Sequence, residues 1–258
     1  FAIFLFLLFA LSRLTFSSDT ITSARPGVLY DPEFRLGVLL VLGVPLLLVL
    51  RHWIAAFEVI EADNLTVGLR AFWGGMFTVL SFLSTAGFES ADWQEARDWS
   101  GLGTPGLVLL GLSLVGGGVA TTAGGVKLLR VYALYLHGKR EVERLVHPSS
   151  VGHATGAGRR IRRHGAYIAW VFFMLFAMSL TFVTMLLAGF GQDFESALIL
   201  SVSALSTTGP LISAASETPI RLLELSAGAK LCYGAAMVLG RLETLAIIAL
   251  LNPAVWRD

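Results

Sequence analysis

The stretches Ser84-Thr85-Ala86-Gly87-Phe88 and Ser206-Thr207-Thr208-Gly209-Pro210 share the pattern Ser-Thr-X-Gly and begin 122 residues apart. Each follows an apolar segment, residues 67–83 or 193–205, that is shorter than the roughly 20 residues a helix needs to cross a bilayer. Irregular backbone at membrane depth is tolerated only where it is buried in protein or lines water. The repeated pattern therefore predicts two re-entrant half-helices, each ending at a polar loop inside the membrane.

The composition is that of a membrane protein, because 55% of the 258 residues are hydrophobic and only 14% are charged, against about a quarter in soluble domains. A net charge of +1 gives no electrostatic basis for binding nucleic acid. The single cysteine, Cys232, lies in an apolar stretch and excludes an intrachain disulfide. The function is therefore to be sought in the membrane segments.

Apolar runs at residues 36–57, 167–190 and 225–251 are long enough to span the bilayer. The run at 105–136 is too long for one span and is interrupted by glycines, so it predicts two half-helices around an irregular loop. Residues 1–11 are too short to cross alone. Because the sequence starts with Phe1 inside this run, we interpret them as the end of a preceding membrane helix of a longer protein, with a shortened signal segment as the alternative.

Loop charges predict the orientation and the domain organisation. Seven basic residues lie between positions 137 and 164, which makes this loop cytoplasmic by the positive-inside bias, while the acidic stretch 89–103 faces outside. Asp193, followed by Glu195, predicts an N-cap at the outer start of the second half-helix. The fold class is an all-α polytopic membrane protein with tandem membrane–pore helix–membrane repeats. Its parts are 1–35 (a preceding helix and a cytoplasmic connection), 36–136 (first repeat), 137–164 (basic loop) and 165–258 (second repeat).

The repeated loop has the chemistry of a cation site. Glycine in a fixed place lets a loop turn its carbonyls toward a common axis, where they replace the hydration shell of a monovalent cation. Each half-helix also aims its partially negative C-terminal end at the loop, which favours a cation over an anion. The alternative is that Ser-Thr-X-Gly forms only a polar corner for helix packing.

Two charged residues need separate explanations. Arg241 lies deep in the last predicted span, so it must be paired or face water, with Glu243 either its partner or a charge at the interface. Lys127 is expected to extend its side chain to the cytoplasmic interface.

The sequence resembles the Trk/Ktr/HKT superfamily of potassium transporters, and specifically the membrane subunit of bacterial Trk systems. The similar stretches are Asp-Pro-Glu-Phe-Arg at 31–35, Gly-Gly-Gly-Val-Ala-Thr-Thr-Ala-Gly-Gly-Val-Lys at 116–127, Gly-Arg-Leu-Glu at 240–243 and Asn-Pro-Ala-Val-Trp-Arg at 252–257. That subunit has four membrane-pore-membrane repeats, and this chain resembles the third and fourth. Its loops differ from the Thr-Val-Gly-Tyr-Gly of strict potassium channels, which leaves the choice between potassium and sodium open.

The resemblance implies roles for individual residues. Both Ser-Thr-X-Gly stretches, Ser84 to Phe88 and Ser206 to Pro210, correspond to strands of an ion filter. The potassium ligands are expected at Thr85, Gly87, Thr207 and Gly209. The expected intramembrane gate comprises Gly116, Gly117, Gly118, Thr121, Thr122, Gly124, Gly125, Lys127 and Arg241.

The resemblance also implies potassium uptake across the cytoplasmic (inner) membrane, with potassium as the substrate, no bound cofactor and no enzymatic activity. Expected partners are membrane lipid, the missing N-terminal repeats of the same chain, a second copy in a homodimer, and a TrkA/KtrA-like nucleotide-binding regulatory subunit docked on the basic loop. The alternative function is a membrane-embedded enzyme for lipid-linked phosphates, with residues 159–163 as a basic anchor. A structural scaffold would explain the spans but not the duplicated loops.

Overall fold

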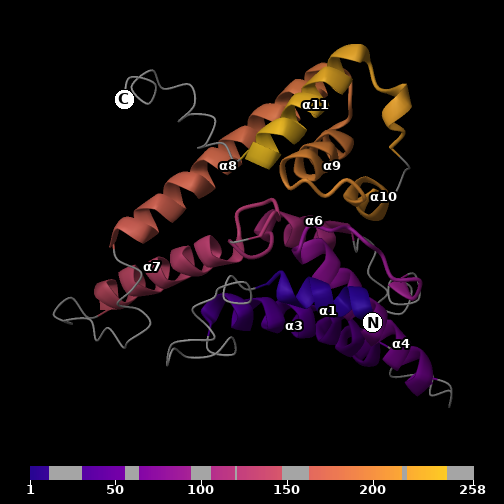
Figure 1. The fold of residues 1–258 in the computed structure, drawn as a ribbon, viewed down its shortest axis with the longest axis vertical. Coiled ribbons are helices and arrows are strands. Elements are labelled where there is room, and N and C mark those ends of the chain that lie inside the picture. The colour runs from indigo at the N-terminus through magenta and orange to yellow at the C-terminus, as the bar shows by residue number, and fades with distance from the viewer. Residues whose placement is uncertain are drawn as a thin grey trace.

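The computed structural model describes residues 1–11, 31–55, 64–93, 106–119, 121–146, 163–216 and 220–242. Every regular element in these ranges is a helix (Figure 1). The elements are α1 (Ala2–Phe9), α3 (Pro32–Ala55), α4 (Asn64–Leu83), α6 (Gly106–Val115), α7 (Leu128–Val146), α8 (Arg163–Gly189), α9 (Phe194–Leu205), α10 (Leu211–Ala215), the 3-10 turn η3 (Leu222–Glu224) and α11 (Ala227–Leu242).

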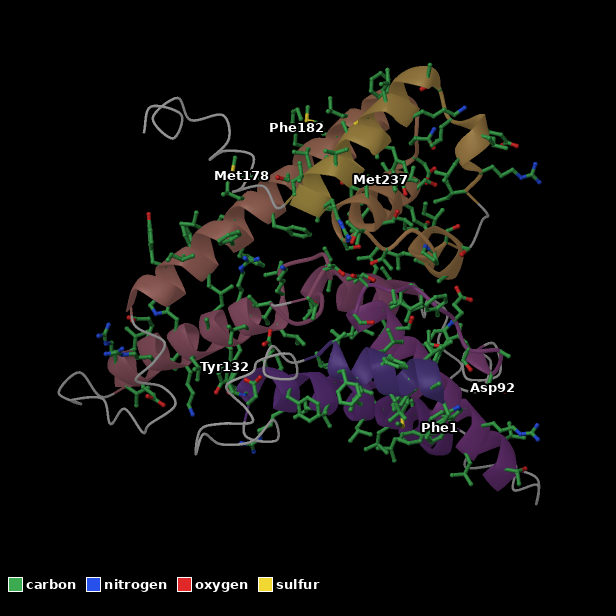
Figure 2. The ribbon with its side chains drawn as sticks, viewed as in Figure 1. Phe1, Asp92, Tyr132, Met178, Phe182 and Met237 are labelled. Atoms are coloured by element: carbon green, nitrogen blue, oxygen red, sulfur yellow. The ribbon has the colours of Figure 1, made fainter. Side chains whose placement is uncertain are left out.

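Three helices are long and apolar enough to cross a membrane, and they contain the segments Pro32–Arg51, Thr66–Leu83 and Gly165–Gly189. The spans predicted at 36–57 and 167–190 are thereby confirmed as α3 and α8. Both present most of their surface outward, and Met178 and Phe182 project from the outer face of α8 (Figure 2). The end of the span predicted at 225–251 lies outside the described residues, since α11 is described to Leu242.

Helix α4 is longer than the half-helix predicted at 67–83. It begins at Asn64 and has 20 residues, so its length alone would allow it to cross a bilayer. Its surroundings differ from those of a peripheral span, because 50% of its apolar window is buried, against 22% for α3 and 17% for α8. The helix predicted from the sequence was therefore too short, whereas the interior position of α4 agrees with the prediction of a pore helix.

The helix broken by glycines is confirmed: α6 ends at Val115 and α7 begins at Leu128. The far end of the intervening loop returns to α6, because the N–H of Val126 donates to the carbonyl of Leu114 (2.9 Å) and the N–H of Lys127 to that of Val115 (2.8 Å). The boundary predicted after residue 136 is not a helix end, because α7 continues to Val146. Part of the segment predicted as a basic loop is therefore helical.

Each half of the chain buries its own pore helix. In the first half, Val79, Phe82 and Leu83 of α4 pack with Leu109 and Leu112 of α6. Helix α1 packs against the middle of α4, where the ring of Phe1, the residue before α1, stacks on that of Trp73 with centroids 5.2 Å apart (Figure 2). Helices α4 and α6 thus form the interior of this half (Figure 1).

In the second half, α9 packs beside α8 and α11 (Figure 1). Eight of its 12 residues are buried. Its start is capped as predicted, since Asp193 accepts a hydrogen bond from the backbone of Ser196 at 3.1 Å. Hydrogen bonds from the Ser196 side chain and backbone lower the pKa of Asp193 from its ordinary value. This carboxylate therefore stabilises the helix N-terminus at neutral pH.

Helix α11 approaches the end of α9 so closely that only glycine fits at Gly240. A Cβ there would lie 2.5 Å from the carbonyl oxygen of Leu205. We expect Gly240→Ala to destabilise the protein by about 1–3 kcal/mol through overpacking. The control is Gly234→Ala on the same helix, where a Cβ meets nothing within 4 Å and helix propensity should stabilise by up to about 1 kcal/mol. Thermal unfolding in detergent measures both, and equal shifts for the two variants would contradict this packing.

Candidate functional site

The two predicted filter loops begin with the same backbone turn. Thr85 has φ of 59° and Thr207 has φ of 58°, a left-handed conformation that is uncommon outside glycine. Behind each threonine the next N–H reaches back to the helix: that of Ala86 donates to the carbonyl of Ser81 (2.9 Å), and that of Thr208 to the carbonyl of Ser203 (3.0 Å). These pairs keep the spacing of 122 residues, so the internal repeat predicted from the sequence is present in the hydrogen bonding.

After the turn, the first loop runs back along its own helix. The N–H of Phe88 donates to Ser81 Oγ (2.6 Å), and the N–H of Ser90 to Thr78 Oγ1 (3.3 Å). Gly74 leaves room for the returning chain, because a Cβ there would lie 2.9 Å from the backbone of Asp92. The chain therefore runs along α4 and returns beside it.

The second loop departs from this course at Pro210. Proline occupies the position equivalent to Phe88 but has no N–H to donate. The chain turns into the short helix α10 instead, and Ser203, the counterpart of Ser81, shares a hydrogen bond with the Tyr233 hydroxyl on α11 (2.9 Å). The two loops are thus equivalent at their turns and different beyond them.

The loops lie against each other. A Cβ on Gly87, whose φ is +79°, would lie 2.8 Å from Cδ of Pro210. Gly209 precedes that proline, so the two glycines predicted as potassium ligands are neighbours in space. They are not equivalent, because a left-handed φ is found at Gly87 but not at Gly209, where a Cβ would meet nothing within 4 Å.

Most hydroxyl groups of the predicted filter residues form hydrogen bonds within their own loop or to the helix before it. The buried Ser84 donates to the carbonyl of Ser81 (3.0 Å), and Ser206 donates to Thr208 Oγ1 (3.1 Å). The side chain of Phe88 is exposed instead of packed into the core. The described residues contain no group of three or more His, Cys, Asp or Glu side chains that could hold a metal ion. Backbone carbonyls and threonine hydroxyls are therefore the oxygen ligands that these loops offer.

The predicted gate, residues 116–127, is in contact with both filter loops. The N–H of Gly124 donates to Thr85 Oγ1 in the first loop (3.1 Å). On the other side, a Cβ on Gly124 would overlap the carbonyl oxygen of Ser206 in the second loop. Left-handed φ values at Gly116 (72°) and Gly125 (77°) turn the chain at the two ends of the segment. Glycine at these positions thus brings one irregular segment against the ends of two pore helices.

Arg241 reaches the gate from α11. Its Nη1 donates to the carbonyl oxygen of Thr122 at 3.3 Å, so two residues of the predicted gate are in contact. Thr121 is instead bound within the segment, with Oγ1 donating to the carbonyl of Gly118 (2.6 Å). Glu243, considered as a partner of Arg241, lies outside the described residues. The gate is therefore joined to α11 by one exposed hydrogen bond.

Lys127 does not extend to the membrane interface as predicted. Its side chain is buried, with 7% exposed, and Nζ donates to the carbonyl oxygen of Val119 at 3.4 Å. The backbone bond from Lys127 to Val115 explains the difference, because it folds the start of α7 against the end of α6. Lys127 is consequently part of the gate's internal structure.

Glu33 is a site residue that the sequence reasoning missed. It lies in the first turn of α3, is fully buried, and accepts the N–H of Val119 on Oε1 at 2.7 Å. Glu33 and Lys127 thus bind the two backbone groups of one gate residue. An acid in a first helical turn is commonly a surface charge that favours the helix dipole, so the sequence signal at Glu33 was ambiguous.

Together these elements define the class: a polytopic α-helical membrane protein with two buried helices that end in the same turn, paired polar loops and an irregular segment in contact with both loops. A family model described as TrkH, cation transport protein, matches residues 4–255. The chain therefore belongs to the TrkH family of cation transport proteins.

Relatives and a solved structure agree with this assignment. The Trk system potassium uptake protein TrkH of Vibrio parahaemolyticus is 32% identical over 232 residues, covering 88% of this chain and 44% of that protein. TrkG of Escherichia coli K12 is 26% identical over 229 residues, with the same coverage. The crystal structure of the potassium transporter TrkH from Vibrio parahaemolyticus matches with a TM-score of 0.71 at 29% identity, covering 98% of this chain and 52% of that one.

The chain thus spans about half the length of the relatives it matches. These relatives are described as transport proteins and not as enzymes, so the alternative of a lipid-phosphate enzyme has no support.

Glu33 provides a test of how the gate is held. We expect Glu33→Ala to destabilise the protein by about 1–3 kcal/mol, because it removes a buried acceptor from the Val119 N–H. Glu33→Gln keeps an acceptor oxygen and should destabilise the protein less than Glu33→Ala. The matched control is Glu195→Ala, which removes an exposed acid from the first turn of α9. Thermal unfolding measures all three, and an equal effect at Glu195 would show that the buried contact contributes nothing.

Proposed function

We propose that this chain supplies two walls of a monovalent-cation pore and takes part in potassium uptake across the cytoplasmic membrane. The observation that carries the proposal is the pair of pore helices that end in the same left-handed threonine turn and meet at Gly87 and Pro210. The names of the relatives support potassium as the ion.

The chemistry follows from the helix ends. The C-terminal ends of α4 and α9 both lead into the paired loops, so the partial negative charge of the two helix ends makes this region electronegative. Carbonyl oxygens there, with the hydroxyls of Thr85 and Thr207, can replace the hydration shell of a cation. We assign the potassium ligands to Thr85, Gly87, Thr207 and Gly209.

The segment 116–127 acts as the gate in this proposal. It lies against both filter loops and is joined to Arg241, whose positive charge raises the barrier to a cation. Opening requires the part of the segment around Thr122 to leave the pathway, and the exposed Arg241 bond is one contact that has to break.

The remaining parts of the pore lie beyond this chain. Two repeats provide two walls, and we propose that further repeats of the same polypeptide complete the ring around the ion. The complete protein would assemble as a homodimer in the inner membrane. The basic residues that follow α7 suit the docking of a nucleotide-binding regulatory subunit of the TrkA/KtrA kind, because they combine positive charge with a cytoplasmic position.

The filter is tested by ion uptake into liposomes that contain the full-length protein, with sodium as the competitor of potassium. We expect potassium uptake above that of empty liposomes and a lower preference for potassium in Gly87→Ala, because a Cβ there strains the loop against Pro210. A distortion of about 1.4 kcal/mol changes ion affinity about tenfold. Gly111→Ala in α6, where a Cβ meets nothing within 4 Å, is the control. Absence of uptake by the unmodified protein would refute the proposed function.

The gate is tested in the same liposomes. Arg241→Ala should raise the uptake rate, because it removes both a positive charge and the bond to Thr122. Thr122→Val should leave the rate unchanged, since Arg241 binds the backbone carbonyl and not the side chain of Thr122. Lys230→Ala removes a charge from the exposed start of α11 and is the control. Unchanged uptake in Arg241→Ala at equal protein level would exclude this contact as the gate.

A further inference from the structure

A cavity of ≈ 450 Å³ lies between the second half of α7 and the first turns of α8, away from the filter and the gate. Helix α7 lines it with His137, Arg140, Glu141 and Arg144. Helix α8 adds two aromatic side chains, Tyr167 and Trp170. The cavity therefore combines basic groups on one wall with aromatic rings on the other.

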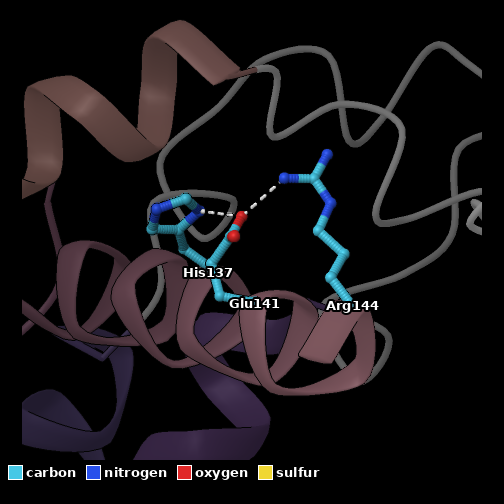
Figure 3. A network of polar contacts seen from close by, with 3 residues as sticks. All are labelled: His137, Glu141 and Arg144. Carbon is cyan, nitrogen blue, oxygen red and sulfur yellow. Dashed lines mark hydrogen bonds and ion pairs between the residues drawn. The ribbon is translucent and has the colours of Figure 1, made fainter. Parts of the chain in front are cut away.

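One positive charge in this cavity has no acidic partner among the described residues. Glu141 accepts a hydrogen bond from Arg144 at 2.9 Å and lies 4.0 Å from Nδ1 of His137 (Figure 3). Within the described part of the chain, Arg140 forms no ion pair with an acid. Two arginines face one carboxylate, so the cavity carries a net positive charge even when His137 is neutral. The guanidinium of Arg140 and the remaining N–H donors of Arg144 are therefore available to bind an anion.

The position of the cavity relative to the bilayer identifies the source of that anion. Tyr167 and Trp170 lie at the start of the span Gly165–Gly189, and both are about half exposed or more. Tyrosine and tryptophan at a span end are typical of the membrane–water interface. The concentration of basic residues between positions 137 and 164 places this end of α8 on the cytoplasmic side. The cavity is thus at the level of the lipid headgroups in the cytoplasmic leaflet.

We propose that this cavity binds the phosphate of an anionic phospholipid headgroup. Arg140 and Arg144 donate charge-assisted hydrogen bonds to the phosphate oxygens, and Trp170 and Tyr167 pack against the glycerol part of the lipid. A zwitterionic headgroup fits less well, because its cationic end would enter a cavity that is already positive. The inference does not depend on ion transport, since lipid binding is measured separately from flux.

The test uses the purified protein in zwitterionic phosphatidylcholine nanodiscs, titrated with short-chain phosphatidylglycerol. Native mass spectrometry counts bound lipids, and the rise in unfolding temperature reports the affinity. We expect Arg140→Gln to weaken binding about tenfold. Lys139→Gln is the matched control, because this neighbouring cation is paired with Glu143 at 3.9 Å and does not line the cavity. It should change the affinity less than about twofold.

Glu141→Gln distinguishes binding from damage to the fold. This variant removes the negative charge and releases Arg144, so the affinity for phosphatidylglycerol should rise, whereas structural damage would lower it. Equal losses in Lys139→Gln and Arg140→Gln would overturn the proposal in favour of general surface attraction. Equal binding of phosphatidylcholine would also overturn it. Competition by inorganic phosphate at matched concentration would assign the cavity to a soluble anion, and displacement of the lipid by an acidic cytoplasmic protein would assign it to a protein partner.

Discussion

A helix that ends in an apolar interior must satisfy its last backbone groups, and this constraint governs the structure around the filter loops. Helices α4 and α9 end among buried residues at Leu83 and Leu205. Both solve the problem with a threonine in the left-handed region and a hydrogen bond from the following N–H to the carbonyl of a buried serine. The turn keeps the chain inside the protein and turns it away from the helix axis.

Residues 116–127, which we propose as the gate, are held in part by side chains that differ in burial. At Val119 it is held by the buried side chains of Glu33 and Lys127, and at Thr122 by the exposed guanidinium of Arg241. Buried charge-assisted hydrogen bonds contribute more to stability than exposed ones, which compete with solvent and are screened by salt. Within this segment, Thr122 is therefore held by an exposed contact, whereas the N–H groups of Gly124 and Lys127 are bound to Thr85 Oγ1 and to the carbonyl of Val115.

The sequence predicted the features that depend on local composition. Long apolar runs identified α3 and α8, glycines marked the break between α6 and α7, and Asp193 marked the start of α9. The contact of Arg241 was also predictable, because a charge deep in an apolar helix needs a partner. Hydropathy could not show that α7 continues to Val146, because an exposed amphipathic helix and a charged loop have similar compositions. It also did not show that α4 starts at Asn64, three residues before the apolar run. The burial of Glu33 and Lys127 depends on how α3 and α7 pack around residues 116–127, which is tertiary information.

The two repeats differ beyond their shared turn. Phe88 uses its N–H to bind Ser81, whereas Pro210 has none to offer, and Ser203 pairs with Tyr233 of α11. This bond joins α11 to the interior of α9, and the close approach of Gly240 to Leu205 extends the contact to the end of the pore helix. Arg241 follows Gly240 directly and reaches Thr122 from that position. The absence of a backbone donor at Pro210 thus accompanies the docking of α11, the helix that carries Arg241, so the two repeats make different contacts although they begin with the same turn.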